Sequence, residues 1–345
     1  MKKLACTAAL AVTTALAGAL PAMADYPTAP VQFIVPFPPG DFEDITTRMI
    51  AAQLSEVTGV SASVVNRPGG GDGPFPGALE VLAGPTDGSV IGSFVIGVPV
   101  IGPEIGIGIE KDSFTPIGVY LTYPFVLATA GDAPYSDMAE LAAYAQDNDV
   151  VLGHFGAGLT PTKATFAGAA LMDFEFADDA AFDLLDCNSL SSGDADVINT
   201  TLALVEPCLD DIKILANIGQ ERIGKLPNVG TLAEQSGAAD IELWNGLFVK
   251  KGTPQEVIDV IADVAQQVIA SDAGQQLMAE TGARLYWEGT AEATARIEAV
   301  DCSTDLTTSE VCGSTRKPPS EFTAVDMALV PISRPRKPSS SPWRR

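Results

Sequence analysis

Short apolar segments alternate with longer segments in which apolar residues recur every three or four positions. An apolar run at residues 31–36 predicts a strand, and the helical spacing of apolar positions over residues 42–57 predicts a helix. The same patterns predict strands at residues 62–65, 90–95, 150–153 and 213–216, and helices at 77–82, 162–172 and 254–270. Because strands that alternate with helices pack in layers, we expect an α/β fold with largely parallel sheets.

The first 24 residues have the pattern of a secretory signal. Two lysines precede an apolar stretch over residues 4–20, and Ala22-Met23-Ala24 fits a cleavage site before Asp25. The apolar stretch is rich in alanine and threonine and too short to span a bilayer well, which favours cleavage over a retained anchor. We therefore expect residues 1–24 to be a signal peptide and the mature protein to be periplasmic.

Charge and composition exclude several functions. The 345 residues carry 20 Lys and Arg against 44 Asp and Glu, a formal net charge of −24, so a nucleic-acid partner is not expected. The single histidine, His154, argues against a zinc site built from imidazoles and against a Ser-His-Asp hydrolase. No Cys-x-x-Cys spacing is present, and we expect no metal and no cofactor.

The C-terminal segment differs from the rest of the chain. Residues 301–345 contain 7 basic and 5 acidic side chains and six prolines, whereas residues 25–300 contain 11 basic and 39 acidic side chains. Such a change in composition is typical of a tail. Three interpretations stay open: a basic tail that docks on a membrane or partner, a disordered extension, and a frameshift that replaced a native C-terminal helix near residue 300.

Two of the five cysteines, Cys187 and Cys208, lie in the body of the chain. An exported protein meets an oxidising compartment, so these two residues either form a disulfide or remain buried free thiols. Cys6 lies in the expected signal, and Cys302 and Cys312 lie in the tail.

Two loops follow predicted strands and open predicted helices, at residues 38–44 and 153–160. In α/β folds ligands bind at the carboxyl ends of strands, next to helix N-termini that carry a partial positive charge. Small residues in both loops allow main-chain N–H groups to approach a ligand. This arrangement suits a carboxylate or phosphate even in a body with few basic residues.

Five motifs in order resemble the Bug family, the periplasmic solute-binding receptors of tripartite tricarboxylate transporters. The resemblance covers about residues 26–299 and is carried by Tyr26-Pro27 through Pro38-Pro39-Gly40 with Asp44 and Arg48, by Asn66-Arg67-Pro68-Gly69, by Asp87-Gly88, by Arg222, Leu226-Pro227-Asn228-Val229, Thr231 and Glu234, and by Trp244-Asn245-Gly246-Leu247-Phe248 with Gly252-Thr253-Pro254.

This resemblance implies a two-lobed type II periplasmic-binding-protein fold with a hinge between the lobes. Lobe one would comprise residues 25–122 and 247–300, and lobe two would comprise residues 123–246. The implied function is to capture a small carboxylate by lobe closure and to deliver it to the membrane subunits of the transporter, with the receptor itself a monomer. An orphan receptor that feeds a sensor system remains an alternative.

The resemblance also implies which residues contact the ligand. The two loops and one downstream position supply the candidates Pro39, Gly40, Asp41, Phe42, Asp44, His154, Gly156, Ala157, Gly158, Thr160 and Asp178. His154 either hydrogen-bonds the ligand or caps its loop, and Phe42 either covers the ligand or staples the helix.

The first loop departs from the family pattern. Asp41-Phe42-Glu43 stands where the family usually has Gly-Gly-Ser or Gly-Gly-Thr. Like charges about 4 Å apart cost roughly 1 kcal/mol in water and more when shielded, so inward-facing acids would disfavour a tricarboxylate. Three alternatives stay open: the acids pair with a cationic or hydroxyl group of the ligand, they meet a cation-bound carboxylate, or they point to solvent at the helix N-terminus.

A different class of function, an enzyme, would use acid pairs such as Asp178 with Asp179 or Asp210 with Asp211. Acid pairs are common on solvated surfaces, so no catalytic residue is expected. A third class, a structural or interaction protein, would show no stabilisation by any small molecule.

Overall fold

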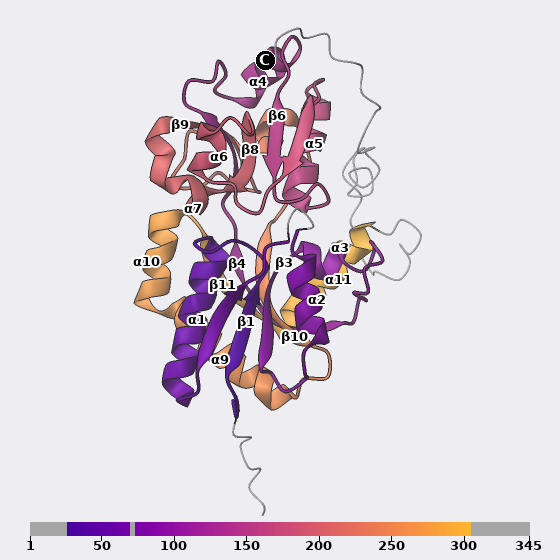
Figure 1. The fold of residues 1–345 in the computed structure, drawn as a ribbon, viewed down its shortest axis with the longest axis vertical. Helices are drawn as coiled ribbons and strands as arrows, with labels where there is room; N and C mark the ends of the chain where they lie inside the picture. The colour runs from indigo at the N-terminus through magenta and orange to yellow at the C-terminus, as the bar shows by residue number, and fades with distance from the viewer. Residues whose placement is uncertain (1–25, 70–72, 305–345) are drawn as a thin grey trace, which may run out of the picture.

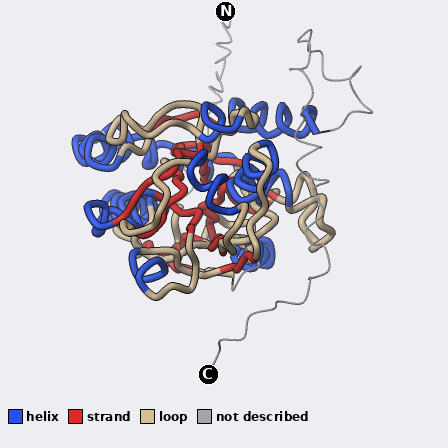
Figure 2. Tube along the Cα trace, turned by 90° about the horizontal axis from the view of Figure 1, so that it is seen from above, coloured by secondary structure: helices blue, strands red, loops and turns tan. Residues whose placement is uncertain are grey.

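The computed structural model describes residues 26–69 and 73–304. Two lobes lie one above the other, and in each the strands lie inside a shell of helices (Figure 1 and Figure 2). The expected signal peptide, residues 70–72 and the tail from residue 305 onward lie outside the described residues. None of the helices over the described ranges is both long enough and apolar enough to cross a membrane.

Lobe one is built on a six-stranded sheet in the order β11-β4-β10-β3-β1-β2. Its first part contains β1 (Val31–Val35), α1 (Phe42–Thr58), β2 (Ala62–Asn66), α2 (Phe75–Ala83), β3 (Val90–Val95), α3 (Gly97–Ile101) and β4 (Phe114–Thr122). Its second part contains β10 (Trp244–Lys250), α9 (Gln255–Ala270), α10 (Asp272–Thr281), β11 (Arg284–Gly289) and α11 (Thr290–Thr304).

Lobe two is built on a five-stranded sheet in the order β7-β6-β8-β5-β9. It contains β5 (Phe125–Ala130), α4 (Met138–Ala145), β6 (Val151–His154), α5 (Thr160–Leu171), β7 (Asp178–Ala181), α6 (Cys187–Ser191), β8 (Val197–Thr201), α7 (Leu202–Val205), the 3-10 helix η1 (Glu206–Asp211), β9 (Ile212–Ile218) and α8 (Leu232–Ser236).

The strands and helices predicted from the periodicity are confirmed, with ends that differ by at most two residues. The expectation of largely parallel sheets is wrong. β1 pairs in parallel with β2 and β3, and β6 with β7 and β8, but β4, β5, β9, β10 and β11 pair antiparallel with their neighbours. The chain leaves lobe one after β4 and returns through β10, so the returning strand enters the sheet in the opposite direction.

Helices cover both faces of the first sheet (Figure 1). The helix α9 is an amphipathic helix whose apolar residues recur at helical spacing, and these residues are buried in the core against the sheet and α1: Val257, Ile258, Ile261, Val264, Ala265, Val268 and Ile269. On the other face lie α2, α3 and α11. This packing fixes the carboxyl ends of β1 and β3, from which the site loops emerge.

Two chain segments cross between the lobes side by side. The main-chain N–H of Tyr123 donates a hydrogen bond of 2.8 Å to the carbonyl of Leu243, which ties the outgoing segment to the returning one. The returning strand β10 begins at Trp244, three residues before the expected start of the second part of lobe one at residue 247. Residues 244–246 pair with β3 and β4, which places them in the first sheet.

A disulfide joins Cys187 to Cys208 within lobe two, so the alternative of two free thiols is wrong. The bond links the start of α6 to the helix η1 that follows β8. It closes a loop with a sequence separation of 21 residues around β8.

Candidate functional site

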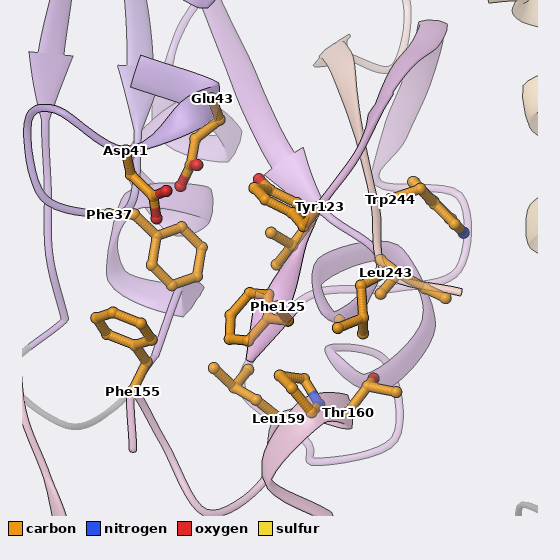
Figure 3. Close-up of a pocket in the computed structure, with 14 residues that line it drawn as sticks. Phe37, Asp41, Glu43, Tyr123, Phe125, Phe155, Leu159, Thr160, Leu243 and Trp244 are labelled. Atoms are coloured by element: carbon orange, nitrogen blue, oxygen red, sulfur yellow. The ribbon is translucent and has the colours of Figure 1, made fainter. Parts of the chain in front are cut away.

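A pocket lies between the lobes at the ends of β1, β3, β5 and β6 (Figure 3). Segments from both lobes and both crossings line it: Phe37, Asp41, Glu43, Val95, Ile96, Gly97, Tyr123, Phe125, Phe155, Leu159, Thr160, Pro161, Leu243 and Trp244. The volume open to the centre of a water molecule is about 30 Å³, which is room for roughly two waters. The lobes are therefore closed over the pocket, and an organic ligand requires them to separate.

Aromatic rings from the two lobes meet in this pocket. Phe37 of lobe one and Phe155 of lobe two pack edge to face with ring centroids 5.8 Å apart. Phe125 lies 6.5 Å from Phe155 and 5.9 Å from Tyr123, again edge to face. Such pairs contribute about 0.5–1.5 kcal/mol beyond their buried area, so the rings both hold the lobes together and form an apolar wall.

Asp41 is buried, with 2% of its surface exposed, and caps the N-terminus of α1. Its Oδ1 accepts hydrogen bonds from the main-chain N–H of Phe42 at 2.8 Å and from the Thr201 hydroxyl at 2.5 Å. Burial is the main cause that raises the pKa of Asp41 to about 6, against the lowering effect of these two hydrogen bonds. Thr201 ends β8, so this contact also joins the lobes.

Glu43 lies beside Asp41 in the first turn of α1 and is 1% exposed. Burial, reinforced by the charge of Asp41, raises the pKa of Glu43 well above its usual range, while the Tyr123 hydroxyl lowers it in part. Tyr123 in turn accepts a hydrogen bond of 2.6 Å from Asn245. Within the described part of the chain, Oε2 of Glu43 has no hydrogen-bond partner. A buried polar atom of this kind costs free energy unless a ligand satisfies it.

The pocket wall opposite the carboxyl pair comes from α5. Thr160 begins this helix, and the residue before it, Leu159, provides no side-chain cap. The first main-chain N–H groups of α5 therefore remain available at the positive end of the helix dipole. Among the described residues that line the pocket, none is Lys, Arg or His.

Asp44, expected at the ligand, instead fastens its own loop. Its Oδ2 accepts hydrogen bonds of 2.9 Å from the Gly40 N–H and from Arg48, and its Oδ1 accepts one of 2.9 Å from Asn66. Pro39 and Gly40 are exposed and do not line the pocket.

Phe42 and the acids beside it occupy different environments. The ring of Phe42 is fully buried in the core of lobe one and is not among the pocket residues, so it anchors the helix. Asp41 and Glu43 both line the pocket, and the alternative in which they face solvent is wrong.

Of the candidates in lobe two, only Thr160 lines the pocket. Gly156 and Gly158 line a separate recess whose other walls are Gly73, Phe75, Pro76, Leu79, Ile105, Ile107 and Leu159. Ala157, between the two glycines, is half-buried and lines neither cavity.

His154 and Asp178 lie away from the pocket. His154 is buried, and its Nε2 lies 2.8 Å from Oδ1 of Asp179 on the neighbouring strand β7. Asp178 is exposed on β7, which is an edge strand. Across residues 26–69 and 73–304, no three His, Cys, Asp or Glu side chains are placed to hold a metal ion.

Sequence reasoning missed most of the apolar wall. Phe37, Phe155 and Leu159 belong to the two loops that were singled out, and Tyr123 and Trp244 belong to the expected hinge. The signal was available: aromatic residues clustered where the chain leaves a strand next to a loop of small residues.

A family model described as "Tripartite tricarboxylate transporter family receptor" matches residues 46–303. The chain is 29% identical over 270 residues to a Pseudomonas sp. (strain P51) protein described as "UPF0065 protein in tcbD-tcbE intergenic region", covering 73% of this chain and 77% of that protein.

Two solved structures share the fold. The structure described as "R. palustris Rpa4515 with adipate" has a TM-score of 0.72 at 24% identity and covers 80% of this chain and 94% of that one. The structure described as "Structure of periplasmic binding protein BugD" has a TM-score of 0.68 at 24% identity, with coverage of 79% and 94%.

Proposed function

Since this chain belongs to the family of tripartite tricarboxylate transporter receptors, we propose that it captures a small carboxylate in the periplasm and delivers it to the membrane subunits of such a transporter. The family is one of receptors, so the chain is a solute-binding receptor and not an enzyme. The two-lobed fold, with a pocket enclosed between the lobes, is the arrangement that this role requires.

The observation that carries the proposal is the enclosed interlobe pocket at the N-terminus of α5. Free main-chain N–H groups at a helix N-terminus, together with the Thr160 hydroxyl, form a site for a carboxylate that needs no basic side chain. The adipate with which Rpa4515 was solved is likewise a small carboxylate. Pockets of this kind, apolar with a few convergent polar groups, are typical ligand sites.

We propose that capture occurs by lobe closure. The crossings at Tyr123 and Leu243 form the hinge, and opening separates Phe37 from Phe155 and Thr201 from Asp41. A ligand that enters the open cleft then contacts both lobes, and its binding favours the closed form by its difference in affinity for the two forms.

The periplasmic location and monomeric state belong to the proposal. The signal-like pattern over residues 1–24 supports export, and the disulfide between Cys187 and Cys208 suits an oxidising compartment. The aromatic and carboxyl groups of the pocket all come from one chain, so a second copy is not needed to complete the site.

The test is a thermal-shift panel on the exported protein with mono-, di- and tricarboxylates and amino acids, followed by calorimetry of each hit. A ligand at 100 times its Kd adds about 2.7 kcal/mol to the free energy of unfolding. We expect saturable 1:1 binding, with the ligand recovered unchanged. A well-folded protein that no carboxylate-containing compound stabilises would contradict the proposed function, and conversion of the ligand would contradict a pure receptor.

A further inference from the structure

The pocket contains two buried carboxyl groups and no buried positive charge to match them. Asp41 and Glu43 both line it, and Oε2 of Glu43 lacks a partner among the described residues. The basic residue nearest along α1, Arg48, is exposed and already paired with Asp44 and Asn66. Two adjacent buried acids remain charged only when a cation compensates them.

We propose that the ligand carries a protonated amine that binds between Asp41 and Glu43, attached to an apolar body. Combined with the carboxylate of the proposed function, on which this inference rests, the ligand class is an amino acid with an apolar or aromatic side chain. The polar atom of Glu43 that has no partner in the described residues marks the position of the ammonium group.

The shape of the pocket fits a ligand whose two charges lie at opposite ends. The carboxyls of Asp41 and Glu43 lie at one end of the group of lining side chains, and Thr160 and Leu159 lie at the other (Figure 3). A zwitterion would place its ammonium at the acids and its carboxylate at the N-terminus of α5. Each end then meets charge of the opposite sign.

The remaining wall accounts for the apolar body. Phe37 lies beside Asp41, and Tyr123 lies beside Glu43 (Figure 3). An ammonium between the acids would therefore also face aromatic rings, which attract cations through their quadrupole. Phe125 and Phe155 extend the wall toward α5, where a polar side chain of the ligand would lose water without gaining a partner.

The same arrangement disfavours a dicarboxylate. With one carboxylate at α5, the second would face Asp41 and Glu43, where burial strengthens repulsion between like charges. Such a ligand would have to bring a metal ion or bind only when both acids are protonated. These are the two rival explanations of the acid pair, and the experiment separates them from the ammonium.

The experiment measures Kd by calorimetry at pH 7.5 for three matched compounds: L-phenylalanine, 2-phenylethylamine and 3-phenylpropionate. Leucine with its amine and acid analogues forms a second set, and adipate and citrate are added with and without Mg²⁺. We expect the amino acid of at least one set to bind about 30-fold or more tightly than the matched acid, which corresponds to loss of one buried charge pair.

Two isosteric variants test the residues. Asp41→Asn and Glu43→Gln are each expected to weaken binding of the amino acid about 30-fold while leaving or improving binding of the matched acid. Glu80→Gln, at an exposed carboxylate paired with Arg67, is the control and should change no Kd. Circular dichroism and the Tm of each variant establish that it is folded.

The outcomes separate this inference from the proposed function. Tighter binding of 3-phenylpropionate, adipate or Mg²⁺-citrate than of any amino acid would overturn the ammonium and leave the carboxylate receptor standing. Binding of 2-phenylethylamine as tight as that of phenylalanine would support the ammonium and contradict the carboxylate. Unchanged amino acid binding by Glu43→Gln and Asp41→Asn would overturn the inference, and an absence of any binding would overturn both.

Discussion

The hydroxyl of Thr201 donates a hydrogen bond of 2.5 Å to Oδ1 of Asp41 and so joins the end of β8 in lobe two to the cap of α1 in lobe one. Both residues are buried, and Asp41 also lines the pocket. One carboxyl therefore caps a helix, holds the lobes together and faces the ligand space. Closure of the lobes and the charge of the pocket depend on the same atom.

Replacing Thr201 by valine should weaken lobe closure. The change removes the donor and leaves one face of a buried carboxyl unsatisfied, a loss of about 1.5–3 kcal/mol. We expect a larger radius of gyration in solution scattering without ligand and a weaker Kd for any ligand that binds the closed form. Thr200→Val is the matched control, because the Thr200 hydroxyl bonds to the Leu185 carbonyl inside lobe two. Equal effects of the two variants would contradict a role in closure.

The free energy of unfolding should fall as pH rises through the range set by Asp41. Its pKa of about 6 lies above the ordinary 3.8, so the folded protein binds this proton more tightly than the unfolded chain. Stability is therefore unaffected below about pH 4, falls between about pH 4 and 6, and stays lower above that; a rise of about two units corresponds to roughly 3 kcal/mol. Glu43, whose pKa is raised further by burial, extends the fall to higher pH.

Urea unfolding at pH 5 and pH 7.5 measures this difference. The double variant Asp41→Asn with Glu43→Gln should show a smaller fall than the wild type, since the many exposed acids are common to both proteins. An identical fall in both proteins would place the titrating groups elsewhere on the acidic surface.

Opening the disulfide between Cys187 and Cys208 should destabilise lobe two. Closing a loop of about this length, 21 residues in sequence separation, stabilises a protein by roughly 3 kcal/mol in the chain-entropy description. Urea unfolding with and without reductant measures the loss, and the Cys187→Ser, Cys208→Ser double variant should match the reduced protein and no longer respond to reductant. A reductant effect that persists in the double variant would contradict this assignment.

Much of the fold was predictable because its elements are locally encoded. The helices α1 and α9 show apolar residues at helical spacing, and the loop from Pro38 to Asp44 is recognisable from its small residues and the helix that follows. Strand direction was not predictable, because a buried strand has the same apolar pattern in parallel and antiparallel sheets. The strands β5 and β8, which run antiparallel to each other, were missed for lack of a distinctive pattern.

The site was predictable only in part, because its shape depends on contacts between distant segments. The sequence indicated that Asp41 and Glu43 stand in a ligand loop, but their burial results from Phe155 and Thr201 in the other lobe. His154 was a reasonable candidate at the end of β6, yet its ring turns toward Asp179 on the neighbouring strand. Such pairings between distant segments leave no local pattern.

Replacing Arg296 by glutamine should destabilise lobe one and loosen the returning crossing. Arg296 on α11 bonds to Glu242, just before β10, at 2.6 Å and to Glu288 on β11 at 2.6 Å. The change leaves two partly buried carboxylates without their cation, and we expect a loss of about 1–2 kcal/mol in urea unfolding.

Arg222→Gln is the control for this prediction. Arg222 forms an ion pair with Glu234 in which both side chains are nearly half exposed, and such surface pairs contribute about 0–1 kcal/mol. A loss at Arg296 no larger than that at Arg222 would show that the partly buried cluster does not brace the crossing.

The hydrogen bond between the Tyr123 N–H and the Leu243 carbonyl has a mechanical consequence. Two bodies connected by two adjacent strands cannot slide apart freely, because the strands resist stretching and define a line about which the bodies rotate. The relative motion of the lobes is thereby reduced to nearly one angle. A membrane subunit that grips both lobes at their far edges would read the occupancy of the pocket as that single angle, whatever the chemistry of the solute inside.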